Sequence, residues 1–173
     1  LFDNFKNSVE EFIQTYNEYK QTLDKTISDV QEIKEMNTTV NTVDGLRAAL
    51  LKGGTIYVEP GIYDIPHDNP LLYTSFTNVI GKGEVILRLD LRADGYIMVR
   101  PKLSGLEGGY SISNVTFENI IFDGQNSGKQ VGLFATCHSK YIKLNKCVFR
   151  NLNSPWHLIE INSSYDVELN SCV

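Results

Sequence analysis

The carboxylates of the C-terminal half are the residues of this sequence best suited to chemistry on a polysaccharide. A glycoside hydrolase uses two of them, about 5 to 9.5 Å apart. The candidates are Glu118, Asp123, Glu160, Asp166 and Glu168. Glu160 in HLIEIN aligns with Ala135 of the preceding repeat, so no stacked pair is expected there, and Asp123 in FDGQN is expected to form a turn with Gly124. The pattern predicts no catalytic pair, and the catalytic residues stay unknown.

Histidines and basic residues give no cofactor or metal site either. His67, His138 and His157 have no Cys or His partner at ligand spacing. A lyase would place an Arg or Lys beside bound calcium, but no Asp cluster accompanies Arg100 or Arg150. GKGE at 81–84 lacks the frame of a phosphate-binding loop and is read as a turn. We therefore expect neither a cofactor nor a metal.

An apolar stripe around Trp156 is the feature most indicative of a contact surface. Trp156, Leu133 and Leu158 are expected on an outer face, beside Glu160. Outward apolar columns mark partner surfaces. Trp156 could pack against another copy of the chain, or stack on a sugar ring with His157 or Glu160 as polar neighbours. The aliphatic surroundings favour the inter-chain contact.

Composition excludes some classes of partner. The chain has 173 residues and a formal net charge of -5 without a Lys/Arg cluster, which argues against nucleic acid. No apolar run reaches the roughly 18 residues of a membrane span. The N-terminal LFDNFKNSVEEF is acidic and amphipathic, unlike a signal peptide. It lacks a starting Met, so we expect a piece of a longer protein. Cys147 and Cys172, which share a repeat column, are read as small buried residues in the reduced state.

A nonapeptide pattern occurs three times near the C-terminus, as NVTFENIIF (114–122), YIKLNKCVF (141–149) and YDVELNSCV (165–173). Aligned on Val115, Ile142 and Val167, the repeats are offset by 27 and 25 residues, which indicates a repeat architecture. Alternation within each repeat predicts that Thr116, Lys143 and Glu168 point outward. The residues predicted to point inward are Val115, Phe117, Ile120, Phe122, Ile142, Leu144, Cys147, Phe149, Val167 and Leu169. Asn119, Asn145 and Asn170 are expected at sharp bends, since Asn tolerates the left-handed conformation.

Residues 1–37 carry a heptad pattern that predicts a coiled-coil helix. Ile13 and Ile27 widen the apolar face and favour a parallel trimer, while Thr26 interrupts it. The expected trimer interface consists of Phe2, Phe5, Val9, Phe12, Tyr16, Tyr19, Leu23, Val30 and Ile33. The alternative is an amphipathic helix lying along its own domain.

Residues 38–54 are expected to form a linker and a short capping helix over 46–51, capped by Asp44 and closed by Gly53 and Gly54. From residue 55 to 173 apolar and polar residues alternate with a period of two, which indicates successive short strands. The run DGLRAALLKGGTIYVEPGIYDI, followed by TNVIGKGEVIL, resembles the pectate-lyase-like right-handed parallel β-helix family over about residues 42–173. The expected fold class is thus a coiled coil followed by an all-β parallel β-helix. Because the pattern stops mid-repeat at Val173, we expect the β-helix to be C-terminally incomplete.

A coiled coil leading into such a β-helix resembles phage tailspike and tail appendage proteins. This resemblance implies a homotrimer in the virion, attached to other tail or baseplate proteins. It also implies recognition of a cell-wall or capsular glycan on the host. One alternative is a polysaccharide depolymerase whose active site lies on coils beyond residue 173. Another is a bacterial surface adhesin.

Overall fold

The computed structural model describes residues 2–102 and 112–173, with the side chains of residues 2–5, 34 and 35 left out of the description. The chain divides into two compact units, Leu1–Ile33 and Lys34–Val173. We call the second one the strand unit.

Helix α1 (Phe2–Glu35) forms the first unit up to Ile33. Its apolar stripe is exposed to solvent: Phe12 keeps 70% and Tyr19 75% of their surface exposed. Val9, Tyr16 and Leu23 are exposed as well, Val30 and Ile33 are half-buried, and the side chains of Phe2 and Phe5 lie outside the described residues.

The expected coiled coil was wrong as a description of this fold. α2 (Val43–Lys52), the other helix in the described part of the chain, belongs to the strand unit. Within the described residues, the first unit therefore contains no second helix with which α1 could supercoil. The 3–4 spacing makes the helix amphipathic, and it cannot by itself supply the partner that a supercoil needs.

The strand unit contains fourteen strands within the described residues. Their bounds are β1 (Asn37–Val40), β2 (Gly54–Val58), β3 (Gly61–Ile65), β4 (Leu71–Tyr73), β5 (Thr77–Gly81), β6 (Val85–Leu89), β7 (Tyr96–Pro101), β8 (Ile112–Glu118), β9 (Ile121–Ser127), β10 (Val131–Cys137), β11 (Ser139–Asn145), β12 (Val148–Leu152), β13 (Ile159–Asn162) and β14 (Tyr165–Asn170).

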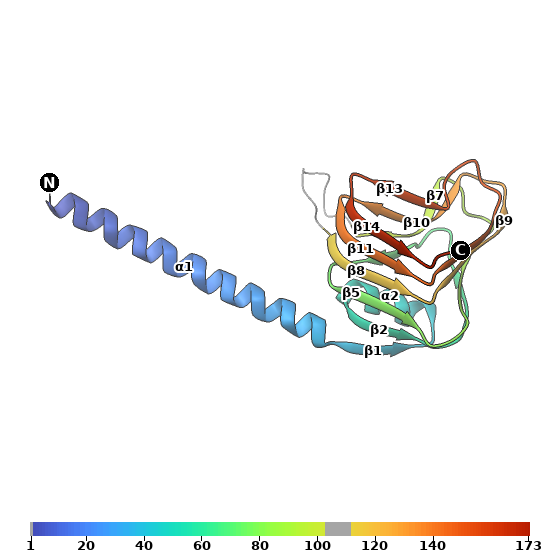
Figure 1. Ribbon diagram of the computed structural model, residues 1–173, viewed down its shortest axis with the longest axis horizontal. Helices are drawn as coiled ribbons and strands as arrows, with labels where there is room; N and C mark the ends of the chain where they lie inside the picture. Colours follow the sequence, from blue (N-terminus) through green and yellow to red (C-terminus); the bar gives the residue numbers. More distant parts are fainter. Residues whose placement is uncertain (1, 103–111) are drawn as a thin grey trace. The chain divides into compact units, whose positions relative to one another are not determined.

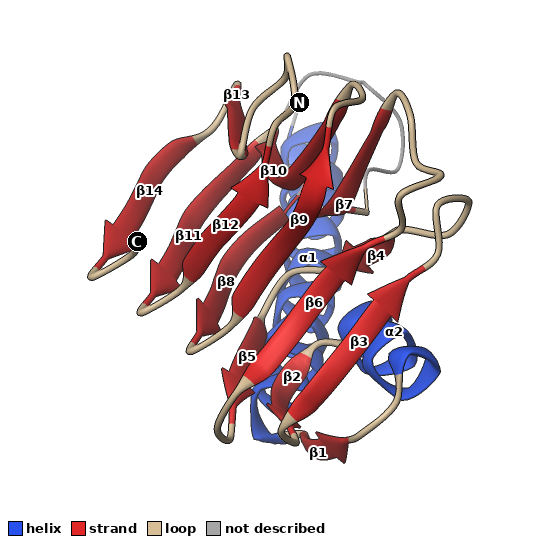
Figure 2. Ribbon diagram, turned by 90° about the vertical axis from the view of Figure 1, so that its right-hand side faces the viewer, coloured by secondary structure: helices blue, strands red, loops and turns tan. Residues whose placement is uncertain are grey.

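The strands form three sheets in which every pairing is parallel. Sheet A has the order β1-β2-β5-β8-β11-β14, sheet B the order β12-β9-β6-β3, and sheet C the order β13-β10-β7-β4. From β2 onward the chain visits A, B and C in turn, so each set of three strands makes one coil (Figures 1 and 2). Three parallel sheets are compatible with a β-helix. The all-β class was nevertheless wrong, because α2 packs against β4 and β2 and the fold is α/β.

The three repeats pair in the register read from the sequence. Ile142 lies opposite Val115 on one side and Val167 on the other, and Leu144 lies opposite Phe117 and Leu169. The members on β8, β9 and β11 are buried together with Ile120 and Cys147, whereas Phe149, Val167 and Leu169 at the last rungs keep some exposure. Stacking of like residues on successive coils thus builds the core.

The sharp bends between sheets A and B fall one residue later than expected in two repeats. The left-handed residues are Asn119 (φ 57°), Lys146 (φ 51°) and Ser171 (φ 54°). Asn145 and Asn170 precede the bend instead, and the Asn170 amide donates to Asn145 Oδ1 at 3.0 Å. Asn145 and Asn170 therefore bridge neighbouring coils, and neither of them forms the bend itself.

The segment expected to be a linker contains a strand. β1 pairs with β2 from Asn37 to Val40. α2 begins earlier than expected, because Thr42 and not Asp44 is its N-cap: the Thr42 hydroxyl accepts from Gly45 N at 3.1 Å. Gly53 closes the helix with φ 83°, a conformation that glycine adopts at little cost.

Candidate functional site

The turns that join sheet B to sheet C gather charged side chains from successive coils. They comprise residues 66–70, 90–95, 128–130 and 153–158. Proline at position 66 helps to end β3, because it has no backbone N–H to donate to the sheet. Since the strands run parallel, these turns lie at the same end of neighbouring strands. Two adjacent hollows open there.

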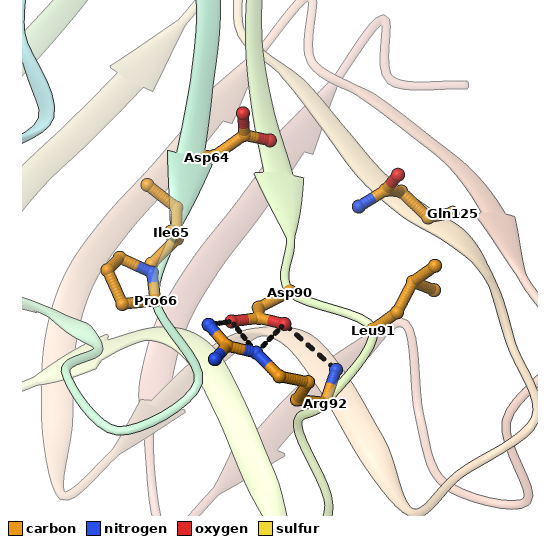
Figure 3. Close-up of a pocket in the computed structure, with 7 residues that line it drawn as sticks. All are labelled: Asp64, Ile65, Pro66, Asp90, Leu91, Arg92 and Gln125. Atoms are coloured by element: carbon orange, nitrogen blue, oxygen red, sulfur yellow. Dashed lines mark hydrogen bonds and ion pairs between the residues drawn. The ribbon is translucent and has the colours of Figure 1, made fainter.

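The first hollow lies where β3 and β6 end (Figure 3). It encloses about 350 Å³ and is lined by Asp64, Ile65, Pro66, Asp90, Leu91, Arg92 and Gln125. Both of its carboxylates are paired with arginines. Arg92 Nη2 donates to Asp90 Oδ2 at 2.7 Å, and Arg88 Nη2 donates to Asp64 Oδ2 at 2.8 Å. Its charges therefore already have partners within the chain.

Asp90 is held as a carboxylate. Hydrogen bonds from the Arg92 side chain, and then from the Arg92 backbone N–H, lower the pKa of Asp90 well below its usual range. His67 Nδ1 lies 3.1 Å from Asp90 Oδ2. Because Asp90 does not hold a proton near neutral pH, it cannot act as the general acid of a hydrolase.

The second hollow lies beyond the His67–Asp90 contact, over sheet C. It encloses about 370 Å³ and is lined by His67, Asp68, Pro70, Gly95, Tyr96, Ile97, Arg100, Trp156 and Glu160. Tyr96 donates its hydroxyl to Pro66 O at 2.9 Å. His67 lines the second hollow and contacts Asp90, which lines the first. The two hollows therefore adjoin at this contact, and together they form a depression across several coils.

Arg100 and Glu160 flank strand β10 in the second hollow. Val99 on β7 pairs with Phe134 on β10, and Arg100 is the next residue of β7. Ala135, the next residue of β10, pairs with Glu160 on β13. The two charged residues thus stand on strands two spacings apart, or about 10 Å. Within the described residues, the side chains of Arg100, Glu160 and Asp68 form no hydrogen bond or ion pair. Their charges are available to a ligand.

Trp156 lies on the 153–158 turn, which is fixed to β10. Trp156 N donates to Ser154 Oγ at 3.0 Å, and Ser154 Oγ donates to Val131 O at 2.8 Å. Trp156 keeps 37% of its surface exposed, and Leu158 is exposed nearby in sequence. An indole anchored through its backbone is available to pack against a ligand or another chain.

The expected outward position of Leu133 was wrong. Leu133 and Phe134 are both buried in the core, as is Val131. Strict alternation breaks at this point, because two consecutive large apolar residues face the core between the small Gly132 and Ala135. Of the predicted stripe, Trp156 and Leu158 are exposed and Leu133 is not.

The carboxylates proposed from the sequence do not form a catalytic pair. Asp123 is buried and accepts from Arg150 Nε at 2.8 Å and from Gln125 N at 2.9 Å. Burial alone would raise the pKa of Asp123, but these hydrogen bonds and those from Asn151 outweigh it and lower the pKa. Glu168 lies 3.1 Å from Lys143 Nζ, Glu118 lies 3.8 Å from Lys146 Nζ, and Asp166 is exposed. Among these five, only Glu160 lines a hollow described above.

Across residues 2–102 and 112–173, no three His, Cys, Asp or Glu side chains gather as a metal site would require. Neither α1 nor α2 is both long and apolar enough to cross a membrane.

Comparison with protein-family models, curated proteins and solved structures finds no match to this chain.

Sequence reasoning missed His67, Asp68 and Tyr96 as members of one site. The spacing of charged residues along the sequence could have indicated this site. Asp64 and Arg88, which pair across coils, are 24 residues apart, and His67 and Asp90 are 23 apart. Extending the repeat to the N-terminal coils would have aligned these turns.

Proposed function

We propose that this chain is a structural and host-recognition component of a phage tail, and that its strand unit binds a cell-surface glycan in the second hollow. One observation carries the proposal. The exposed indole of Trp156 lines the same hollow as Asp68, Arg100 and Glu160, whose side chains form no hydrogen bond or ion pair with the described residues.

The chemistry of this hollow suits a sugar. An aromatic ring packs against the C–H face of a pyranose, and charged side chains make strong hydrogen bonds to hydroxyl groups. Asp68 and Glu160 accept such bonds, whereas Arg100 donates them. Because the two hollows adjoin and span several coils, the depression suits a ligand longer than one sugar ring.

The tail assignment draws on the resemblance of residues 42–173 and on the order of a long helix followed by stacked strands. We include in the proposal that three copies associate and attach to other tail or baseplate proteins in the virion. The exposed apolar side chains of α1 support association. Burying one such side chain stabilises a complex by roughly 1.5–3 kcal/mol, and Phe12, Tyr16 and Tyr19 are each more than half exposed in one chain.

The test is binding of the full chain to purified wall and capsular polysaccharides from a panel of bacteria, measured by biolayer interferometry. We expect at least one polysaccharide to bind, and Trp156→Ala to weaken it about tenfold. Glu160→Gln and Arg100→Gln should each weaken it as well, while Tyr57→Ala, which removes an aromatic ring from sheet A, should not.

Two results would contradict the proposal: no binding to any polysaccharide of the panel, or equal binding by the Trp156→Ala and Tyr57→Ala variants. The same samples can be assayed for new reducing or unsaturated ends. Their steady appearance would assign a depolymerase activity in place of recognition alone.

A further inference from the structure

The second hollow contains opposite charges that do not neutralise one another. Its lining includes one guanidinium group, that of Arg100, and two carboxylates, those of Asp68 and Glu160. Within the described residues, none of these three side chains forms a hydrogen bond or an ion pair. All three residues are at least partly exposed. These charges restrict the kind of glycan that the hollow can bind.

The adjoining first hollow is different, because its carboxylates have arginine partners. Arg92 Nη2 donates to Asp90 Oδ2 at 2.7 Å, and Arg88 Nη2 donates to Asp64 Oδ2 at 2.8 Å. Such charge-assisted hydrogen bonds form readily wherever the two groups can reach each other. The second hollow instead keeps one positive and two negative charges for groups outside the chain.

The register of sheet C keeps Arg100 and Glu160 apart. They lie on β7 and β13, with β10 between them, at about two strand spacings or 10 Å. Ala135 of β10, which pairs with Glu160, has only a methyl side chain. Both charges act on the Cys137 thiol of β10: burial is the largest cause that raises its pKa, Glu160 raises the pKa further, and Arg100 lowers it. A group bound over β10 therefore has a positive charge on one side and a negative charge on the other.

We propose that the second hollow selects a sugar unit that carries both an ammonium group and an acidic group. The acidic group lies toward Arg100, the ammonium group lies toward Glu160, and the sugar ring packs against Trp156. Asp68 adds a second carboxylate for the ammonium group. This inference rests on the proposed function, since it names the class of glycan that the same hollow binds.

Sugars of other charge match the lining less well. A purely anionic sugar gains a contact with Arg100 but brings its charge near the carboxylates of Asp68 and Glu160. A purely cationic sugar attracts those carboxylates but is repelled by Arg100. A neutral sugar offers none of the three an opposite charge. Because complementary charges set specificity through both attraction and repulsion, a unit with both charges is favoured over the other three classes.

Trp156 allows binding in this hollow to be measured directly. It is the only tryptophan of the sequence, and it lines the hollow. Its turn lies close over β10, since a Cβ added at Gly132 would meet the carbonyl oxygen of His157 at 3.1 Å. The intrinsic fluorescence of the indole therefore reports whether the hollow is occupied.

The experiment titrates the full chain with four sugars that share one pyranose scaffold and differ in charge. Muramic acid carries an ammonium and a carboxylate, N-acetylmuramic acid only the carboxylate, glucosamine only the ammonium, and N-acetylglucosamine neither. The titrations are made at pH 7, where such amines are mostly protonated, and at one low ionic strength, so that screening is equal. We expect muramic acid to have the lowest Kd, about three- to fivefold below that of either singly charged sugar, as an exposed ion pair contributes.

Two variants assign the charges to their partners. Glu160→Gln should raise the Kd of muramic acid and of glucosamine about three- to fivefold and should not weaken N-acetylmuramic acid. Arg100→Gln should raise the Kd of muramic acid and of N-acetylmuramic acid by a similar factor and should not weaken glucosamine. Glu168→Gln and Lys143→Gln are the matched controls, since they remove the same kinds of charge from an ion pair on sheet A. Both controls should leave every Kd unchanged.

The inference is overturned if glucosamine or N-acetylmuramic acid binds as tightly as muramic acid. It is also overturned if Glu160→Gln weakens the two N-acetylated sugars as much as the two amines, or if muramic acid does not bind. In each of these cases the proposed function still stands when a polysaccharide of the panel binds in a way that depends on Trp156. It fails as well when no polysaccharide binds.

Discussion

Replacing Asp123 tests how the coils are joined. Asp123 on β9 is buried, and its carboxylate accepts hydrogen bonds from Arg150 Nε, Asn151 Nδ2 and Gln125 N. Arg150 and Asn151 belong to β12, the next strand of sheet B. The Asp123→Ala change therefore cuts polar contacts between two coils and leaves a backbone N–H without its acceptor.

The expected loss of stability follows from these contacts. A hydrogen bond to a charged group contributes about 1.5–3 kcal/mol, and the others contribute about 0.5–1.5 kcal/mol each. Because the Arg150 side chain is 42% exposed and regains water, its share is discounted. We expect Asp123→Ala to lower the free energy of unfolding by about 2–4 kcal/mol. Arg150→Ala, which leaves the two other donors in place, should cost less.

The same carboxylate predicts a pH dependence. Its pKa in the folded chain is lower than the ordinary value of 3.8. The contribution of Asp123 is therefore present above pH 3.8 and is lost as the pH falls through the lower, folded-state pKa. Urea denaturation followed by circular dichroism at pH 7 and in steps below pH 4 measures both effects. Equal stabilities of wild type and Asp123→Ala at pH 7 would refute the reasoning, as would a difference that grows on acidification.

Three further outcomes are expected. Leu144→Ala should lower the free energy of unfolding by about 2–5 kcal/mol, since Leu144 is fully buried. Lys143→Ala should leave that free energy nearly unchanged, and equal losses for the two variants in urea denaturation would mean that the register is wrong. Light scattering of the full chain should give the mass of three copies, and replacing Phe12 and Tyr19 by Ser should reduce it; a wild-type monomer would exclude association through α1. Burial is the largest cause that raises the pKa of the Cys147 thiol to about 12. A thiol reagent at pH 8 should therefore modify the half-buried Cys137 before Cys147. The reverse order would contradict the placement of Cys147 in the core.

The repeat could be predicted because it depends on contacts that recur at fixed offsets. Apolar residues in alternation specify which face of a strand is buried, and stacking of like positions made Ile142, Val115 and Val167 recognisable as neighbours. The same reasoning failed at Leu133. A continuous apolar run such as VGLFATC does not show where alternation breaks, and the neighbouring small residues were the remaining signal.

The helix and the charged site were harder to predict, for different reasons. A heptad pattern describes the surface of one helix, and the partner that would cover Phe12 or Tyr19 is not encoded within that segment. The second hollow combines Asp68, Arg100 and Glu160, which lie on three different coils. Only the register of the intervening strands brings such residues together, and in the N-terminal coils that register was not read from the sequence.

The two hollows owe much of their charge to the turns that border them. The turns 66–70 and 90–95 hold Asp68, Asp90 and Arg92 at the same end of neighbouring strands. The core, in contrast, is built mainly from strand residues that stack on successive coils, such as Val115, Ile142 and Val167. Substitutions at exposed turn positions such as Arg92 are therefore expected to change the charge and shape of the hollows while the stack of strands is kept.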